Sequence, residues 1–167
     1  MRDQPSSPPE PGGFVEIDRN GLEVLDAQEC ARLLARTTFG RIGITVGALP
    51  TILPVNYRFV DDRVVFRTTA GTKLDAGTRG AVVAFEIDSI DPVEHSGWSV
   101  VVTGMVSEVT DPDELAQLDA APIPRWAPSQ DDHVVALSTD MVSGRRLAPG
   151  RQLPGGPWSH RSRPGRP

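Results

Sequence analysis

Six short stretches with the residue pattern of β-strands follow one another along the middle of the chain. Apolar residues alternate at Ile42, Ile44 and Val46, and β-branched or aromatic residues dominate the later stretches. Turn residues such as Asp61 and Asp62 separate neighbouring stretches, which favours antiparallel pairing through hairpins. The predicted strands contain residues 42–46, 51–59, 63–69, 81–88, 98–109 and 133–142.

Three short helices are predicted beside these strands. The first covers residues 26–36, where Asp26 and Glu29 form a capping-box pattern. The second lies near residues 72–78, and the third begins at Asp111. Six mostly antiparallel strands with two or three short helices in roughly 130 residues indicate a mainly β protein built as a small barrel rather than an open α/β sheet.

The two ends of the chain differ in composition from its body. Residues 1–13 hold four prolines and two glycines, and residues 148–167 hold nine residues that are Pro or Gly. Such segments bury too little apolar surface to offset the entropy of ordering. We therefore predict a disordered N-terminal arm at 1–13, one folded domain at 14–147 and a disordered basic tail at 148–167.

Composition also narrows the classes of function. The apolar runs are far shorter than the ~20 residues of a membrane-spanning helix, and no apolar export segment follows Met1. The one cysteine, Cys30, cannot form an internal disulfide, so we expect a cytoplasmic protein without a membrane partner. The tail has four arginines and no acid, which leaves residues 1–147 with a net charge of −9 and disfavours nucleic-acid binding.

The usual metal-binding and nucleophile patterns are missing from the sequence. The three histidines, His95, His133 and His160, have neither the spacing of metal ligands nor a cysteine partner. No serine lies in a nucleophile-elbow frame. We therefore expect no metal site and no hydrolase, and we assign no catalytic side chain.

One segment, from Val65 to Lys73, combines groups that bind a phosphate. A strand end supplies Arg67, Thr68 and Thr69, and a glycine turn then leads to a further hydroxyl and to Lys73 at a helix start. Amides, hydroxyls and cations are what a phosphate monoester dianion requires. A solvated strand-to-helix turn would use the same residue types. Lys73 is the only lysine beside sixteen arginines, which favours the phosphate site.

Pro54 interrupts the second predicted strand with a residue that has no backbone N–H group. We expect this position at a sheet edge or a bulge, facing something other than a neighbouring strand. A ligand could fill that gap.

The order and spacing of several motifs between Asp26 and Leu147 resemble the pyridoxamine 5′-phosphate oxidase-like, flavin-binding split-barrel superfamily. In chain order the motifs are residues 39–43 (FGRIG), 54–57 (PVNY), 66–73 (FRTTAGTK), 83–88 (VAFEID) and 97–104 (GWSVVVTG). The resemblance implies a homodimer of six-stranded antiparallel split β-barrels with flavin mononucleotide (FMN) sites in the subunit interface.

The resemblance also implies which residues contact the cofactor. The phosphate would be held by Arg67, Thr68, Thr69 and Lys73. The flavin ring would be lined through backbone groups by Pro54, Val55, Asn56 and Tyr57, with Trp98 approaching from the partner subunit. Trp98 could equally be an aromatic residue of the core or of the dimer interface.

We therefore predict a flavin-dependent oxidoreductase, with FMN as its cofactor, that acts on a small-molecule substrate. The chain has Arg146-Leu147-Ala148-Pro149 without the preceding histidine of the true oxidase, so vitamin B6 oxidation is not expected. Three alternatives stay open: a non-catalytic flavin-binding or redox-sensing module, a member of the same fold that binds a deazaflavin or haem, and a ligand-free structural dimer. An axial haem ligand could come only from His95 or His133.

Overall fold

The computed structural model describes residues 15–120, 123 and 132–149. The predicted N-terminal arm, and all but the first two residues of the predicted tail, lie outside the described residues. In chain order the elements are β1 (Glu23–Leu25), α1 (Ala27–Arg36), β2 (Phe39–Val46), β3 (Leu49–Val60), β4 (Arg63–Thr69), α2 (Lys73–Thr78), β5 (Val82–Asp91), β6 (Ser96–Glu108), α3 (Pro112–Ala120), β7 (Asp132–Ser138) and β8 (Met141–Leu147).

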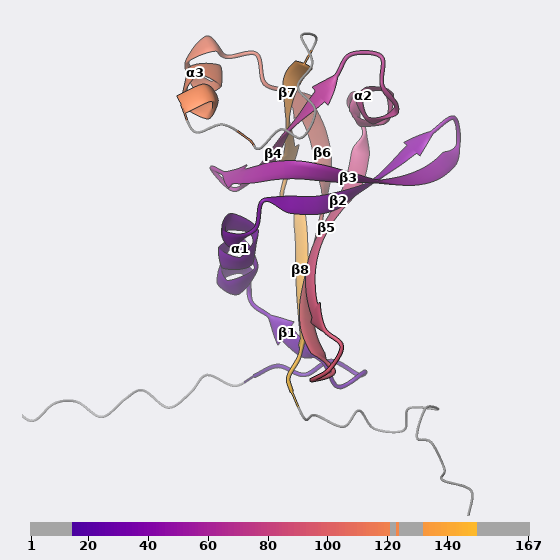
Figure 1. Cartoon of the computed structure of the whole chain (residues 1–167), viewed down its shortest axis with the longest axis vertical. Coiled ribbons are helices and arrows are strands. Elements are labelled where there is room, and N and C mark those ends of the chain that lie inside the picture. Colours follow the sequence, from indigo (N-terminus) through magenta and orange to yellow (C-terminus); the bar gives the residue numbers. More distant parts are fainter. Residues whose placement is uncertain (1–14, 121–122, 124–131, 150–167) are drawn as a thin grey trace, which may run out of the picture.

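Six of the eight strands close into a barrel (Figure 1). Neighbouring strands run in the order β6-β5-β2-β3-β4-β7, and β7 returns to pair with β6. β8 and then β1 extend the sheet beyond β6, and every pairing is antiparallel. The mainly β fold predicted from the sequence is confirmed, and each of the six predicted strands contributes one strand of the ring.

The last predicted strand is two strands in the structure. β7 ends at Ser138 and β8 begins at Met141, because the chain bends between them and the register against β6 shifts by one residue. The Thr139 hydroxyl donates to the Asp62 carbonyl oxygen at 2.7 Å, and the Ser138 hydroxyl donates to the Asp140 carboxylate at 2.8 Å. Neither Gly nor Pro marks this bend, so the sequence pattern continues through it. The three-residue strand β1 was also not predicted, since it is too short to show alternation.

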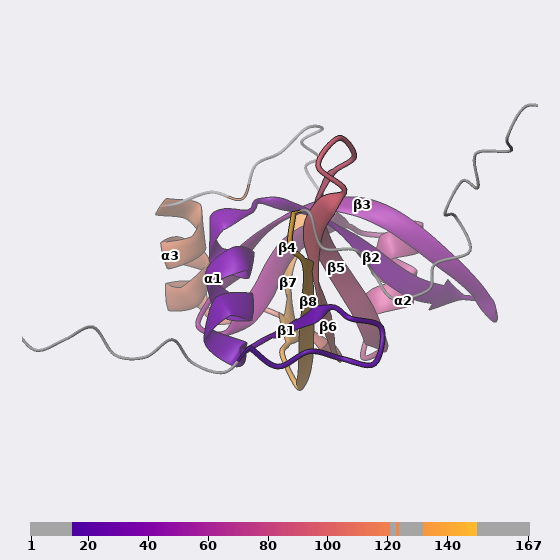
Figure 2. The ribbon, with the colours of Figure 1, turned by 90° about the horizontal axis from the view of Figure 1, so that it is seen from below.

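The three predicted helices are confirmed, and they lie on different sides of the barrel (Figure 2). The Asp26 carboxylate caps α1 by accepting the Glu29 N–H at 2.7 Å, and Cys30, Leu33 and Leu34 of this helix are buried. α1 and α3 lie on one side of the molecule and α2 on the other. None of the described helices is long and apolar enough to cross a membrane.

Aromatic and aliphatic side chains fill the barrel. Tyr57 and Phe85 form an edge-to-face pair with ring centroids 4.8 Å apart. Alternate residues of β4 face two different clusters, since Phe66 belongs to the barrel core whereas Val65 faces α3. The cluster beneath α3 consists of Val65, Val109, Leu118, Ile123, Val134 and Ala136.

β6 changes its partner at Gly104. Residues 97–103 of β6 pair with β8, and residues 106–108 pair with β7. A Cβ atom at Gly104 would lie 1.9 Å from the Ser138 carbonyl oxygen, so glycine is needed where β6 faces the end of β7. Closure of the barrel therefore depends on this close approach.

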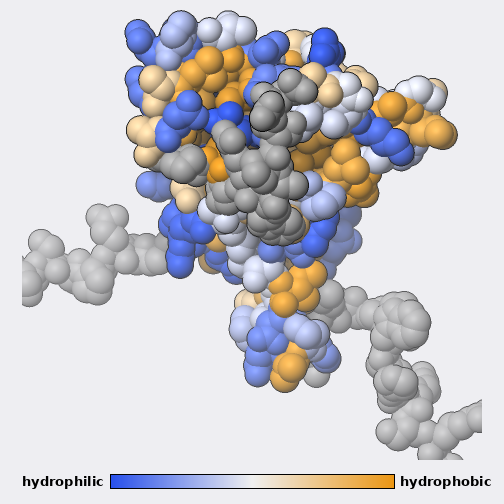
Figure 3. Space-filling model, turned by 45° about the horizontal axis from the view of Figure 1, so that its top comes forward, coloured by the Kyte–Doolittle hydropathy of each residue, from blue (hydrophilic) through white to orange (hydrophobic). Residues whose placement is uncertain are grey.

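The outer side of the sheet has a strip of exposed apolar side chains, which we call the outer apolar strip. Its register runs from Ile52 through Gly43, Ala84 and Thr103 to Met141, and the neighbouring pair Val82–Met105 widens it. On the face that Figure 3 shows, apolar side chains gather in patches among polar ones. The members of the strip with exposed large side chains are Ile52, Val82, Met105 and Met141.

Candidate functional site

The predicted phosphate segment forms a tight loop between β4 and α2. Gly71 has a φ of +76°, in the left-handed region that favours glycine. The Thr72 hydroxyl oxygen caps α2 by accepting the Asp75 N–H at 3.2 Å, and it donates to the Thr69 carbonyl oxygen at 2.8 Å. Lys73 is the first residue of α2, as the sequence predicts.

The buried carboxylate of Asp75 holds this loop from inside the protein. It accepts the Gly71 backbone N–H at 2.8 Å and two hydrogen bonds from the Arg79 guanidinium at 2.8 and 3.0 Å. His133 Nε2 lies 3.2 Å from the same carboxylate. The Arg79 guanidinium, followed by the Gly71 amide, lowers the pKa of Asp75 to about 2. Asp75 is therefore ionised at neutral pH, with Arg79 compensating its charge.

Lys73 differs from several arginines of the chain in having no carboxylate partner among the described residues. It is exposed, and within the part of the chain that the structure describes no carboxylate lies within ion-pair distance of its ammonium group. By contrast, Arg41, Arg63 and Arg79 each pair with a carboxylate. The Lys73 ammonium is therefore available to an anion.

The structure separates Arg67 from Lys73. Successive residues of β4 point to opposite faces, so Thr68 is buried on the barrel side while Arg67 faces α3. There Arg67 Nη2 donates to the Asp119 carboxylate at 2.6 Å, and its buried Nε has no hydrogen-bond partner among residues 15–120, 123 and 132–149. Because α2 and α3 lie on opposite sides of the barrel, Arg67 does not join Lys73 around one loop (Figures 1 and 2). A phosphate contact from Arg67 stays a prediction.

The two threonines of the segment already have partners in the protein. Thr68 Oγ1 lies 3.4 Å from Thr72 Oγ1, and the Thr69 hydroxyl donates to the Asp132 carboxylate at 2.6 Å. Of the four predicted phosphate ligands, Lys73 is therefore the one whose polar group has no partner among the described residues.

β3 and β4 separate next to the residues predicted to line the flavin ring, 54–57, and those predicted to bind the phosphate, 67–69. Their pairing runs from Val60–Arg63 to Tyr57–Phe66 and stops there. Beyond that point β3 pairs only with β2, with Pro54 opposite Arg41, while residues 67–69 continue along β7. Residues 54–56 therefore have one strand edge that no described strand covers, as expected for Pro54, and residues 67–69 flank the same split.

Side chains of the PVNY motif point in different directions at this split. Pro54 is exposed, whereas Val55 and Tyr57 are buried in the barrel core. The Tyr57 hydroxyl donates to the Leu34 carbonyl oxygen at 2.8 Å, and burial raises the pKa of Tyr57 to about 12. Contacts from Val55 and Tyr57 to a ligand in the split would thus come from their backbone groups.

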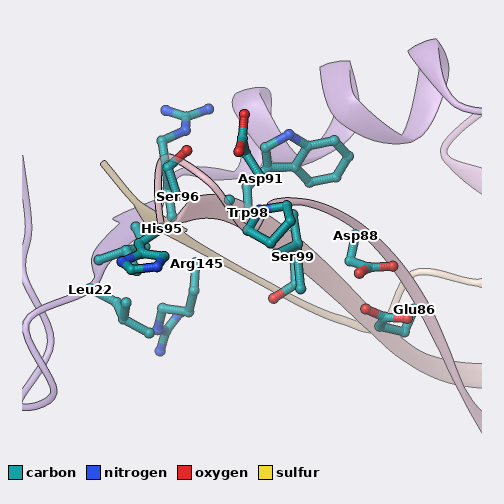
Figure 4. Close-up of a pocket in the computed structure, with 14 residues that line it drawn as sticks. Leu22, Glu86, Asp88, Asp91, His95, Ser96, Trp98, Ser99 and Arg145 are labelled. Atoms are coloured by element: carbon teal, nitrogen blue, oxygen red, sulfur yellow. The ribbon is translucent and has the colours of Figure 1, made fainter. Parts of the chain in front are cut away.

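Trp98 lies in a groove at the far end of the sheet (Figure 4). The groove has a volume of about 500 Å³ and lies between the β5–β6 hairpin and the end of β8. Arg145 on its wall pairs with Asp18 at 3.0 Å. In Figure 1 this hairpin lies at the opposite end of the molecule from α2, so Trp98 and Lys73 of one chain are far apart.

Sequence reasoning missed two side chains that shape the site, Asp75 and Asp119. Thr72-x-x-Asp75 is a capping signature, and Asp75 and Arg79 have the spacing of a helical ion pair, so local pattern could have pointed to Asp75. The contact between Arg67 and Asp119 joins a strand to a distant helix and leaves no local signal.

A closed antiparallel barrel, split beside a cationic loop and extended by two outer strands, defines a split-barrel protein. The chain belongs to the pyridoxamine 5′-phosphate oxidase family, whose profile matches residues 26–146. The resemblance found in the sequence is thereby confirmed.

Relatives of the chain cover most of its length. The uncharacterized protein Rv0080 of Mycobacterium tuberculosis is 40% identical over 151 residues, which are 86% of this chain and 99% of the relative. A FAD-binding protein from Mycobacterium smegmatis is 35% identical, with a TM-score of 0.66 over 75% of this chain and 99% of its own. A protein of unknown function from Corynebacterium diphtheriae is 28% identical, with a TM-score of 0.62 over 76% and 98% of the two chains.

Proposed function

We propose that this protein is a flavin-binding oxidoreductase that holds the phosphate of its cofactor at the loop before α2. The observation that carries the proposal is the Lys73 ammonium group, which has no carboxylate partner among the described residues and sits on a tightly bonded loop. An exposed ammonium group without a carboxylate partner stabilises a phosphate dianion by a charge-assisted hydrogen bond. The 35% identity to a FAD-binding protein supports the same class of ligand.

The residues at the split suit a flavin nucleotide in two respects. The uncovered edge of β3 at residues 54–56 offers backbone groups to the edge of a flat ring, and Lys73 offers a charge to its phosphate. The charged side chains Asp75 and Arg67 are held in ion pairs. They would therefore hold neighbouring groups in place rather than transfer protons. A bound flavin would supply the electron or hydride transfer.

FMN and FAD both fit this proposal. The sequence predicts FMN, and the relative from Mycobacterium smegmatis is named for FAD. Both nucleotides have a phosphate on the ribityl chain, so Lys73 would serve either one. The nucleotide released from the purified protein distinguishes them.

We further propose that the protein acts as a homodimer with the cofactor between subunits. Trp98 and the Lys73 loop lie at opposite ends of one chain, so Trp98 would reach the flavin from a second copy. The outer apolar strip supports this arrangement, because exposed apolar side chains on neighbouring strands are stabilised when a partner covers them. The Trp98 groove would then border the space for a small-molecule substrate.

The absorbance spectrum of the purified protein, with chromatography of the released cofactor, tests the proposal. Flavin bands that bleach when a reductant is added, and recovery on reoxidation, are the expected result. A colourless protein that takes up neither FMN nor FAD would contradict flavin binding. Deazaflavin or haem bands would instead select the alternative cofactors, and a flavin that no reduced substrate can reduce would favour a non-catalytic module.

A further inference from the structure

Asp75 is buried although it is charged. Removing a carboxylate from water is costly unless hydrogen bonds and an opposite charge compensate it. The Thr72 hydroxyl oxygen already caps α2, so the start of the helix does not require an acidic side chain as well. Asp75 instead accepts hydrogen bonds from Gly71 in the loop and from Arg79 at the end of α2, and it lies 3.2 Å from His133 Nε2 in β7. Three separate segments therefore converge on this one carboxylate.

These bonds define the backbone of the loop on which Lys73 sits. The Gly71 N–H points inward to Asp75, and the Thr72 N–H donates to the Thr69 carbonyl oxygen at 3.2 Å. His133 stands directly opposite Thr68 in the β4–β7 register, so its contact with Asp75 ties α2 to the end of β4. The loop is consequently bonded from within, while the Lys73 side chain stays exposed.

We propose that Asp75 is the positioning residue of the phosphate loop. It makes no contact with the flavin phosphate, and it acts by holding Gly71 and Thr72 in the conformation that presents the Lys73 ammonium group. This inference rests on the proposed function, and it adds a residue that controls how strongly the nucleotide is held.

Charge alone predicts the opposite effect of losing Asp75. Its removal makes the surroundings of the loop more positive, which strengthens the attraction for a phosphate dianion. Loss of positioning weakens that attraction, because Lys73 then samples other geometries. The direction of the change in affinity therefore separates the two roles.

The test is a titration of the full chain with FMN and with riboflavin, which lacks the phosphate. We compare Asp75→Ala and Asp75→Asn with the control Glu108→Gln, which removes a carboxylate that also acts on Arg79 but has no bond to the loop. We expect Asp75→Ala to weaken FMN binding about tenfold or more and to change riboflavin binding less than about twofold. Asp75→Asn keeps an acceptor for the Gly71 N–H and should lose less.

Hydrogen exchange of the Gly71 amide in the flavin-free protein gives a second readout. Asp75→Ala should accelerate this exchange, and Glu108→Gln should not. Unchanged or tighter FMN binding by Asp75→Ala, or equal losses for FMN and riboflavin, would overturn the inference. If Asp75→Ala does not fold, the same comparison with Asp75→Asn decides. A wild-type chain that binds neither FMN nor FAD overturns the proposed function itself.

Discussion

Val82 and Met105 stand directly opposite each other on β5 and β6, and their side chains are 66% and 53% exposed. Such a pair is stabilised by burial against another surface. In the proposed homodimer, that surface is the same strip of a second copy.

We therefore expect Val82→Glu and Met105→Glu to shift the protein from dimer to monomer, because each places a charge in the covered strip. Light scattering of the two variants and of the wild type measures the mass. Leu49→Glu is the control, since Leu49 is also exposed but lies at the β2–β3 turn. A wild type that is monomeric, or variants that stay dimeric, would argue against this interface.

Lys73→Ala should weaken FMN binding about tenfold or more and leave riboflavin binding nearly unchanged, because the lost interaction is made to the phosphate. Fluorescence titration of both ligands checks the result. Arg36→Ala, which removes an exposed cation at the end of α1, should change neither affinity. Equal losses for the two ligands would remove Lys73 from the phosphate site.

Two carboxylates make the folded state sensitive to acid. Hydrogen bonds from Arg79 and Gly71 lower the pKa of Asp75 to about 2, and those from Arg32 and Arg146 lower the pKa of Glu29 to about 2. Each folded pKa lies below its usual value, 3.8 for Asp and 4.5 for Glu, so the stabilisation is present above those values and is lost as the pH falls towards 2.

Urea unfolding of the wild type and Asp75→Asn across this range measures the contribution of Asp75. The free energies of unfolding of the two proteins should differ at neutral pH and converge as the pH approaches 2. A difference that is the same at pH 2 and at neutral pH would show that ionisation of Asp75 does not stabilise the fold.

Gly104→Ala should destabilise the protein by roughly 1–3 kcal/mol, the usual range for overpacking. The added Cβ would lie 1.9 Å from the Ser138 carbonyl oxygen, which belongs to the backbone and cannot rotate away. Gly43→Ala is a matched control, because its Cβ would meet its nearest atom at 3.7 Å. Thermal or urea unfolding compares the two variants, and equal midpoints would refute the requirement for glycine at position 104.

The sequence predicts the ring strands well for two reasons. β2 and β5 have a buried and an exposed face, which alternation reveals, whereas β4 and β7 are buried on both faces and show as short runs rich in β-branched residues. The sequence does not reveal β1 or the break between β7 and β8. β1 is only three residues long, and the break is made by side-chain bonds of Ser138 and Thr139 rather than by Gly or Pro. Which strands pair with β6 depends on contacts between distant parts of the chain.

The candidate site was predictable in part for similar reasons. The single lysine, Lys73, and the proline within a strand, Pro54, are visible in the sequence. The structure places Pro54 at the β3–β4 split and Lys73 at the end of the loop that follows β4. The opposite directions of Arg67 and Thr68 also follow from strand periodicity. The contact between Arg67 and Asp119 does not follow from strand periodicity, because packing of α3 against β4 and β7 sets the position of Asp119.

The place of β8 in the sheet affects how the protein can fold as it leaves the ribosome. β1 pairs with β8, and α1 packs on β8 as well as on β3, so these N-terminal elements complete their packing only after the last strand is translated. Until then Leu25 and Cys30, which meet β8 at Gly144, lack this part of the surface that buries them. The nascent chain therefore exposes part of the apolar face of its first helix until synthesis of β8 is complete.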